Sequence, residues 1–158
     1  LFTKIYEEVS GIENVVISYD RSWRDMDYEE IIAFLDEKQD MDKKLCTTMS
    51  GPHRDRIRFV KDKQNFIPTA STGQKRLISI VLRISQAVYF TKITGKKPVL
   101  LMDDVLLEMD PEKRRRIMNL LPEYDQLFCT FLPGEPYEKY KHSGTRVYLI
   151  EKGSWNEQ

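Results

Sequence analysis

The stretch Val99-Leu100-Leu101-Met102-Asp103-Asp104 is a short apolar run that ends in two adjacent carboxylates. A continuous apolar run of this length, without polar alternation, is typical of a strand buried in a parallel sheet. In open α/β sheets, ligands bind at the edge formed by the carboxyl ends of such strands. The run therefore predicts an α/β fold in which Asp103 and Asp104 lie at a ligand-binding edge.

A long helix is predicted before this strand. It follows Ser71, runs to about Thr94 and stops at Gly95, because glycine readily takes the left-handed conformation that ends helices. Apolar residues cover more than one side of this helix, which predicts burial on two faces. These residues are Leu77, Ile78, Val81, Leu82, Ile84, Ala87 and Val88.

Helical and extended patterns alternate along the rest of the chain, and this order favours an α/β layer. Apolar periodicity and turn residues predict where the other elements begin and end. The predicted helices cover 1–10, 26–39 and 111–121, and the predicted strands cover 15–19, 54–60, 64–67, 127–131 and 146–151.

The composition is that of one folded, soluble domain. The chain has 158 residues, of which 41% are hydrophobic, and its formal net charge is zero. Any contact with nucleic acid therefore has to come from a local basic patch. No apolar stretch approaches the roughly 20 residues that span a bilayer. Cys46 and Cys129 lack the spacing of a zinc site and are expected to be reduced and buried. Because the first residue is Leu1 rather than Met, we interpret it as a cut end.

Two places along the chain are candidate sites. The Ser71 hydroxyl can cap the long helix, and Gly73 lets an anion approach backbone N–H groups at the positive end of the helix dipole. One carboxylate of the pair at Asp103 and Asp104 can hold Mg²⁺, while the other orients or deprotonates the water that attacks a phosphoryl group. The plain alternatives are an ordinary helix cap and a strand that ends in polar residues.

Four motifs follow one another in a fixed order. They are Ser50-Gly51-Pro52-His53-Arg54-Asp55, Ser71-Thr72-Gly73-Gln74-Lys75-Arg76, Leu100-Leu101-Met102-Asp103-Asp104-Val105-Leu106 and Glu108-Met109-Asp110. Over nearly the whole chain, these motifs resemble the RecF family of ABC-type ATPases. In that family they correspond to a Gly-Pro-His-Arg-Asp-Asp motif, the signature motif, the Walker B strand and the D-loop.

The resemblance implies a fold and a function. The fold is the C-terminal part of an ABC-type ATPase head, an α/β layered sheet with packed helices that lacks the P-loop half. Residues 1–50 lead into an ATPase subdomain over 51–158. The implied function is ATP hydrolysis coupled to DNA binding in recombinational repair and replication, in the cytoplasm and without a membrane. The implied partners are single-stranded or gapped duplex DNA, a second copy in an ATP-dependent homodimer, and other recombination-mediator proteins.

The resemblance also implies roles for individual residues. Asp103 would coordinate Mg²⁺, and Asp104 would stand where related ATPases carry the glutamate that polarises water. The D-loop residues Glu108 and Asp110 would lie at the dimer seam. The signature residues would face the γ-phosphate of ATP held by a second subunit, and they are Ser71, Thr72, Gly73, Gln74 and Lys75.

The chain departs from the family pattern in several places. Arg56 replaces the second aspartate of the first motif, and Leu107 stands where a serine is usual. The stretch 130–133 supplies no switch histidine, so the γ-phosphate sensor is unassigned. No two glycines have the spacing of a P-loop. This chain alone is therefore expected to bind ATP weakly and to hydrolyse none.

A row of arginines is a candidate DNA contact. Arg54, Arg56 and Arg58 alternate along the predicted strand over 54–60 and would project from one face, where they could bind phosphates. The alternative is a solvated face paired with acidic residues. Two other functions also remain open: an SMC-type chromosome-organising ATPase head, and a non-catalytic DNA or protein interaction module of the same fold. Against the first, residues 1–50 lack the sustained heptads of an SMC coiled coil.

Overall fold

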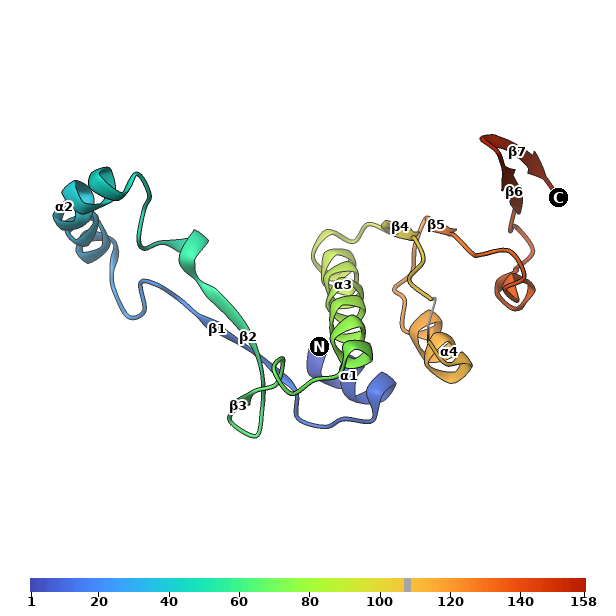
Figure 1. Ribbon diagram of the computed structural model, residues 1–158, viewed down its shortest axis with the longest axis horizontal. Helices are drawn as coiled ribbons and strands as arrows, with labels where there is room; N and C mark the ends of the chain where they lie inside the picture. Colours follow the sequence, from blue (N-terminus) through green and yellow to red (C-terminus); the bar gives the residue numbers. More distant parts are fainter. Residues whose placement is uncertain (107–108) are drawn as a thin grey trace.

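A computed structural model describes residues 1–106 and 109–158 of the chain. Figure 1 shows an elongated molecule with a central body, an arm that ends in helix α2 on one side, and a terminal hairpin on the other. The body contains α1 (Phe2–Ser10), α3 (Thr72–Thr94), β4 (Val99–Met102), α4 (Pro111–Asn119) and β5 (Gln126–Cys129). Leu107 and the predicted D-loop residue Glu108 lie outside the described residues.

The core forms where α1 packs against both α3 and α4. Tyr6, Val81 and Ile117 are fully excluded from solvent and come from these three helices in turn. The arm also contributes, since the ring of Phe2 lies 5.3 Å from that of Phe59, centroid to centroid. The buried apolar residues of the three helices are Phe2, Ile5, Tyr6, Val9, Leu77, Ile78, Val81, Ile84 and Ile117.

Helix α3 begins and ends where the sequence predicts. The Ser71 hydroxyl accepts a hydrogen bond from the Gln74 N–H at 3.2 Å, and the Gln74 side chain accepts one from the Ser71 N–H at 2.7 Å, so the two form a capping box. Gly95 ends the helix at φ 67°. Burial on two faces is a wrong prediction for the last turns, where Tyr89 is 62% exposed and Ile93 64% exposed.

The same helix qualifies, by length and composition alone, as long and apolar enough to cross a membrane, with a mean hydropathy of 1.2 over its best window. This corrects the expectation that no stretch approaches that length. The helix nevertheless packs on α1 and buries Leu77, Val81 and Ile84, and core helices of globular proteins pass the same test of length and composition.

Strands β4 and β5 form the predicted parallel sheet. Their register pairs Val99 with Gln126 and Met102 with Cys129. Full burial of the sheet was a wrong prediction, because only Met102 of β4 is buried, while Leu101 is 75% exposed and Phe128 is 56% exposed. One face of the sheet thus packs on the helical core and the other faces solvent.

The arm is an antiparallel ribbon with a helix at its far end. Strand β1 (Val16–Asp20) pairs with β2 (Arg56–Lys61), which in turn pairs with the short β3 (Gln64–Asn65). Helix α2 (Tyr28–Leu45) starts with a capping box in which the Asp27 carboxylate accepts from the Glu30 N–H at 2.9 Å. It has no buried residue and extends one and a half turns beyond the predicted end at 39.

The C-terminal residues form a short 3₁₀ turn, η2 (Tyr137–Tyr140), and a hairpin of β6 (Tyr148–Glu151) and β7 (Ser154–Glu157). Strand β7 was not predicted. The cysteines also differ from the prediction that both are buried, since Cys46 is exposed and Cys129 is half-buried. Partial burial raises the pKa of the Cys129 thiol, which keeps it protonated and unreactive.

Candidate functional site

The two carboxylates gather around one hydroxyl at the end of the parallel sheet. The β4–β5 register places Thr130 beside Asp103, and the Thr130 N–H donates to the Met102 carbonyl at 3.1 Å. The Thr130 hydroxyl oxygen lies 2.8 Å from Asp103 Oδ1 and 3.4 Å from Asp104 Oδ1, and it accepts from the Asp104 N–H at 2.9 Å. The structure thus brings both predicted carboxylates to one exposed edge.

This carboxylate pair fits a magnesium ion that is shared with a nucleotide. Among residues 1–106 and 109–158, no three or more His, Cys, Asp or Glu side chains form a group that could enclose a metal ion. Mg²⁺ does not need such a group, because it is usually bound through one or two carboxylates together with substrate phosphates and water. The exposed carboxylate oxygens of Asp103 and Asp104 are metal ligands of this kind.

The start of α3 is open to solvent. Ser71, Thr72 and Gly73 are exposed, and apart from the neighbouring residues and the helix's own backbone, no described atom lies within 4 Å of the place where a side chain on Gly73 would begin. The first N–H groups of a helix have no partner within the helix and are suited to bind an anion. Lys75 is exposed in the same turn, whereas the side chain of Gln74 folds back to cap the helix.

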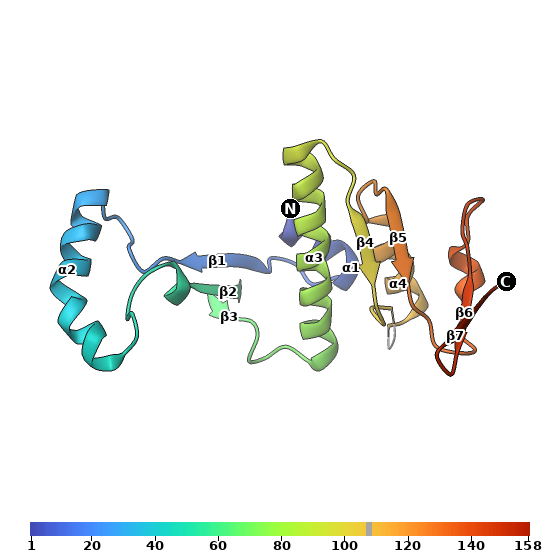
Figure 2. The same cartoon turned by 90° about the horizontal axis from the view of Figure 1, so that it is seen from above.

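The start of α3 and the end of β4 lie at the same end of the body (Figure 2). Arg76, in the second turn of α3, donates to the carbonyl oxygen of Asp104 at 2.8 Å. This hydrogen bond joins two motifs that are 28 residues apart in sequence. Sequence reasoning assigned no role to Arg76 or to the Thr130 hydroxyl, because both contacts depend on how β4 sits between α3 and β5.

The D-loop aspartate has a structural role in this chain. Asp110 caps α4 by accepting from the Lys113 N–H at 2.9 Å, and its carboxylate pairs with Lys113 Nζ at 2.8 Å. These contacts with Lys113 hold the pKa of Asp110 below its usual range. The contact of Asp110 with a second subunit remains a prediction.

The first motif forms the junction between the arm ribbon and α2. The Asp55 carboxylate accepts from the Tyr19 hydroxyl and from the Ser22 N–H at 2.7 Å, and these bonds lower its pKa. Gly51 has φ 128°, and a Cβ there would lie 3.1 Å from the His53 ring. The motif therefore requires glycine for its backbone conformation and aspartate to anchor the turn.

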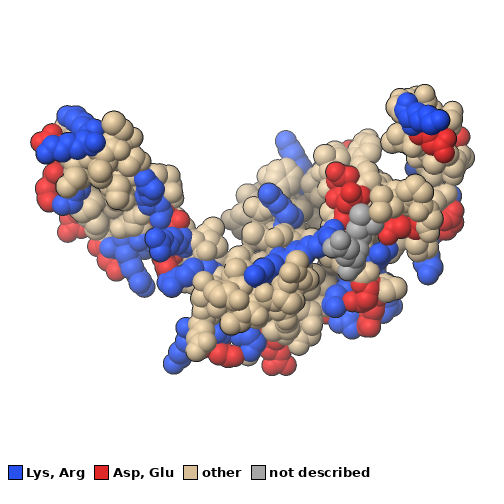
Figure 3. Space-filling model, viewed as in Figure 1, with Lys and Arg blue, Asp and Glu red and all other residues tan. Residues whose placement is uncertain are grey.

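The row of three arginines on one strand face is a wrong prediction. Gly51-Pro52 starts a 3₁₀ turn, η1 (Pro52–Arg54), so Arg54 precedes β2, and its guanidinium donates to the Thr48 carbonyl at 2.9 Å. Arg58 lies on β2 but forms an ion pair with Asp20 of β1. The Arg56 side chain is exposed and has no hydrogen-bond or ion-pair partner among the described residues. Lys and Arg side chains cover part of the arm, with acidic side chains among them (Figure 3).

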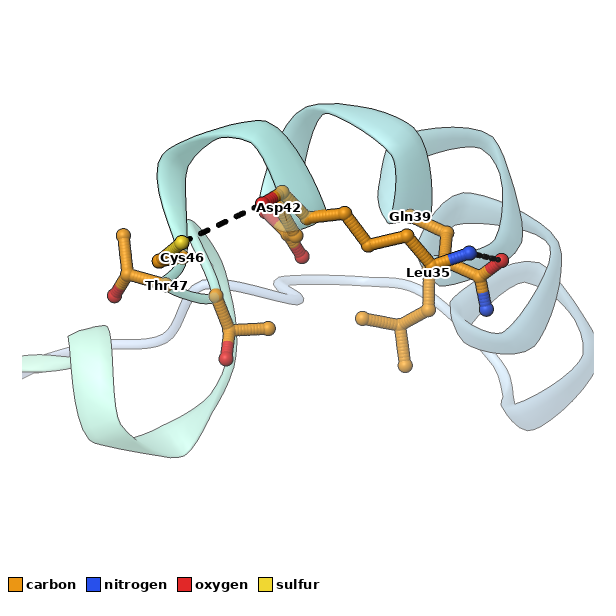
Figure 4. Close-up of a pocket in the computed structure, with 7 residues that line it drawn as sticks. Leu35, Gln39, Asp42, Cys46 and Thr47 are labelled. Atoms are coloured by element: carbon orange, nitrogen blue, oxygen red, sulfur yellow. Dashed lines mark hydrogen bonds between the residues drawn. The ribbon is translucent and has the colours of Figure 1, made fainter.

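The hollow in Figure 4 is lined by residues between Leu35 and Thr48, at the end of α2. It has a volume of about 440 Å³ and is open to solvent between α2 and the loop that follows it. The side chains at its wall bond to one another, as Lys43 Nζ does to Gln39 at 2.8 Å, and the Cys46 thiol points at the Lys43 carbonyl at 3.7 Å. These contacts stabilise the end of α2, and they do not indicate which ligand the hollow would bind.

The chain is similar to proteins from several bacteria. It is 55% identical over 157 residues to the DNA replication and repair protein RecF of Treponema pallidum, a match that covers 99% of this chain and 45% of the relative. It is 38% identical over 137 residues to the protein of the same name from Carboxydothermus hydrogenoformans, covering 86% of this chain and 37% of the relative. No family model matches the chain.

The fold is similar to that of a solved structure described as the recombination mediator protein RecF with ATP in the RecFOR pathway. The TM-score is 0.74 at 24% identity, and the match covers 99% of this chain and 42% of that one. This likeness confirms the predicted α/β fold of an ABC-type ATPase head. The chain spans about half the length of the curated relatives that it matches, and on their identity it belongs to the RecF family of DNA replication and repair proteins.

Proposed function

We propose that this chain carries two half-sites of a DNA-dependent ATPase that works in recombinational repair. The single observation that carries the proposal is the arrangement at the end of β4. There the Asp103 and Asp104 carboxylates meet at Thr130, and Arg76 of the signature helix contacts the Asp104 backbone. An exposed carboxylate pair suits the Mg²⁺ of one nucleoside triphosphate, and an open helix start suits the γ-phosphate of another.

The two half-sites would serve different nucleotides. Asp103 would hold the Mg²⁺ of the ATP bound by its own subunit, and this ion would neutralise charge on the phosphates. Asp104 would orient and polarise the attacking water. The exposed signature residues would contact the γ-phosphate of ATP held by a second copy, through N–H groups and the Lys75 ammonium. Two copies would thus complete each other's site, as an ATP-dependent homodimer.

The expected binding partners and cellular location follow from the family. Single-stranded or gapped duplex DNA would be the nucleic-acid partner, and other recombination-mediator proteins would be the protein partners, in the cytoplasm and without a membrane. The similarity to DNA replication and repair proteins and the ATP-bound structure of a recombination mediator support this proposal. The non-catalytic module is an outcome of the experiment that follows, and the lack of sustained heptads in residues 1–50 argues against an SMC-type head.

The first experiment measures assembly and turnover in the full-length protein that contains this chain. ATP is expected to double the average mass in sedimentation, and gapped DNA is expected to raise the rate of phosphate release. The control is ADP, which lacks the γ-phosphate and should leave the protein monomeric. Binding of DNA without hydrolysis would favour the non-catalytic module. Assembly that is the same with ATP, ADP or neither would contradict the proposal.

A second experiment tests the DNA contact. Arg56→Ala is expected to weaken DNA binding and to reduce the slope of log K against log salt by about 1, as for one lost phosphate contact. Arg56 is the relevant arginine because Arg54 and Arg58 already have partners within the chain. The matched control is Arg115→Ala, an exposed arginine on α4. Equal affinities and slopes for the two variants would remove Arg56 from the DNA contact.

A further inference from the structure

The Thr130 hydroxyl occupies a central place in the candidate site. It lies just past the end of β5, and its neighbours are the Asp103 carboxylate, the Asp104 carboxylate and the Asp104 N–H, at 2.8, 3.4 and 2.9 Å. The Thr130 backbone adds a bond from its N–H to the Met102 carbonyl at 3.1 Å. One residue therefore ties the two parallel strand ends together where both carboxylates emerge.

The number of protons and lone pairs on the Thr130 hydroxyl determines which group donates and which accepts in each of these contacts. A threonine hydroxyl has one proton to donate and two lone pairs to accept with. The Asp104 N–H can only donate, so the hydroxyl oxygen is its acceptor. The single proton then goes to Asp103 Oδ1, which is closer than Asp104 Oδ1. Thr130 thus holds the Asp103 carboxylate through its proton and the Asp104 backbone through its oxygen.

The backbone at Asp104 needs such support. Asp104 has φ 51°, in the left-handed region that costs a residue with a side chain free energy, although aspartate tolerates it better than most. Two contacts fix this conformation: the Asp104 N–H donates to Thr130, and its carbonyl accepts from Arg76 at 2.8 Å. The Asp104 side chain owes its direction to this backbone conformation.

We propose that Thr130 is a positioning residue, whose hydroxyl orients the Asp103 and Asp104 carboxylates toward the nucleotide. This inference rests on the proposed ATPase function and adds a residue to it. Thr130 would act through the two carboxylates, which are the groups assigned to the Mg²⁺ and the attacking water. Its hydroxyl sets the distance and direction of these two groups, and small errors of this kind are costly in catalysis.

The test compares Thr130→Val with Thr130→Ser in the full-length protein. Valine keeps the shape of threonine without the hydroxyl, whereas serine keeps the hydroxyl. Thr130→Val is expected to lower kcat for ATP about 10- to 100-fold while KM changes by less than about threefold, because a contact that orients the reacting groups is lost. Thr130→Ser is expected to keep kcat within about threefold of that of the unaltered protein. Thr91→Val, on α3, controls for the general cost of losing a threonine hydroxyl.

Amide hydrogen exchange gives a readout that needs no turnover. In Thr130→Val the Asp104 N–H loses its acceptor, so its exchange is expected to accelerate at least about tenfold, while Thr130→Ser keeps it slow. Unchanged kcat and unchanged amide exchange in Thr130→Val would overturn the inference. A kcat in Thr130→Ser as low as that of Thr130→Val would also overturn it. If the unaltered protein hydrolyses no ATP, the proposed function fails, and the exchange comparison still decides whether Thr130 positions Asp104.

Discussion

Asp104→Asn in the full-length protein is expected to lower ATP turnover at least about 100-fold and to leave ATP affinity within about threefold, because an amide cannot accept the proton or charge of an attacking water. The substitution keeps the size of the side chain. It also keeps the contacts of the Asp104 backbone with Thr130 and Arg76, so the strand end should retain its conformation. Phosphate release and binding of a fluorescent ATP analogue measure the two effects separately.

A matched control separates this effect from a general loss of charge. Asp40→Asn changes an exposed carboxylate on α2, far along the arm from the strand end, and should leave turnover unchanged. Turnover that survives in Asp104→Asn would show that another group acts on the water. Loss of both affinity and turnover would instead assign Asp104 to binding.

Ser71→Arg is the variant expected to have the largest effect on assembly. Arginine would fill the open space at the start of α3, where Ser71, Thr72 and Gly73 are exposed, and would keep a second subunit's nucleotide from reaching the helix N-terminus. We expect the dissociation constant of the ATP-driven dimer to rise at least about 100-fold, which corresponds to about 2.7 kcal/mol. Sedimentation in saturating ATP measures this change.

Two controls accompany this variant, because Ser71 is also the helix cap. Ser71→Ala removes the cap, at about 1 kcal/mol of stability, but leaves the space open, so it should weaken the dimer far less than Ser71→Arg does. Ser79→Arg adds the same bulk on an exposed position two turns further along α3 and should also dimerise. An ATP-dependent dimer that forms equally well in Ser71→Arg would mean that the subunits meet through another surface.

Elements with strong end signals were predictable from the sequence. Ser71 and Gly95 set the ends of α3 through local hydrogen bonds and a local φ, so no distant residue was needed to place them. The end of α2 was missed because the regular apolar spacing stops near Gln39, while the helix continues to Leu45 through a mostly charged stretch. The strand β7 was missed because its pairing with β6 depends on the turn at Lys152 and Gly153, whose positive φ values give the hairpin its turn.

The candidate site was predictable in its residues and less so in its contacts. Asp103 and Asp104 follow from an apolar strand that ends in carboxylates, and this is a local pattern. Thr130 is separated from Asp103 by 27 residues, and only the parallel register of β4 and β5 brings them together. Arg54 shows the reverse case: strand alternation suggested a phosphate contact, whereas the turn at Gly51-Pro52 directs its guanidinium to the Thr48 carbonyl.

The uncovered face of the β4–β5 sheet should lower the solubility of the chain on its own. Parallel sheets are normally covered on both faces, yet Leu101 and Phe128 are 75% and 56% exposed. Open strand edges beside apolar surface are places where chains associate, and a formal net charge of zero removes the repulsion that would oppose it. Preparations of this chain alone should therefore precipitate more readily than a longer polypeptide that shields this face.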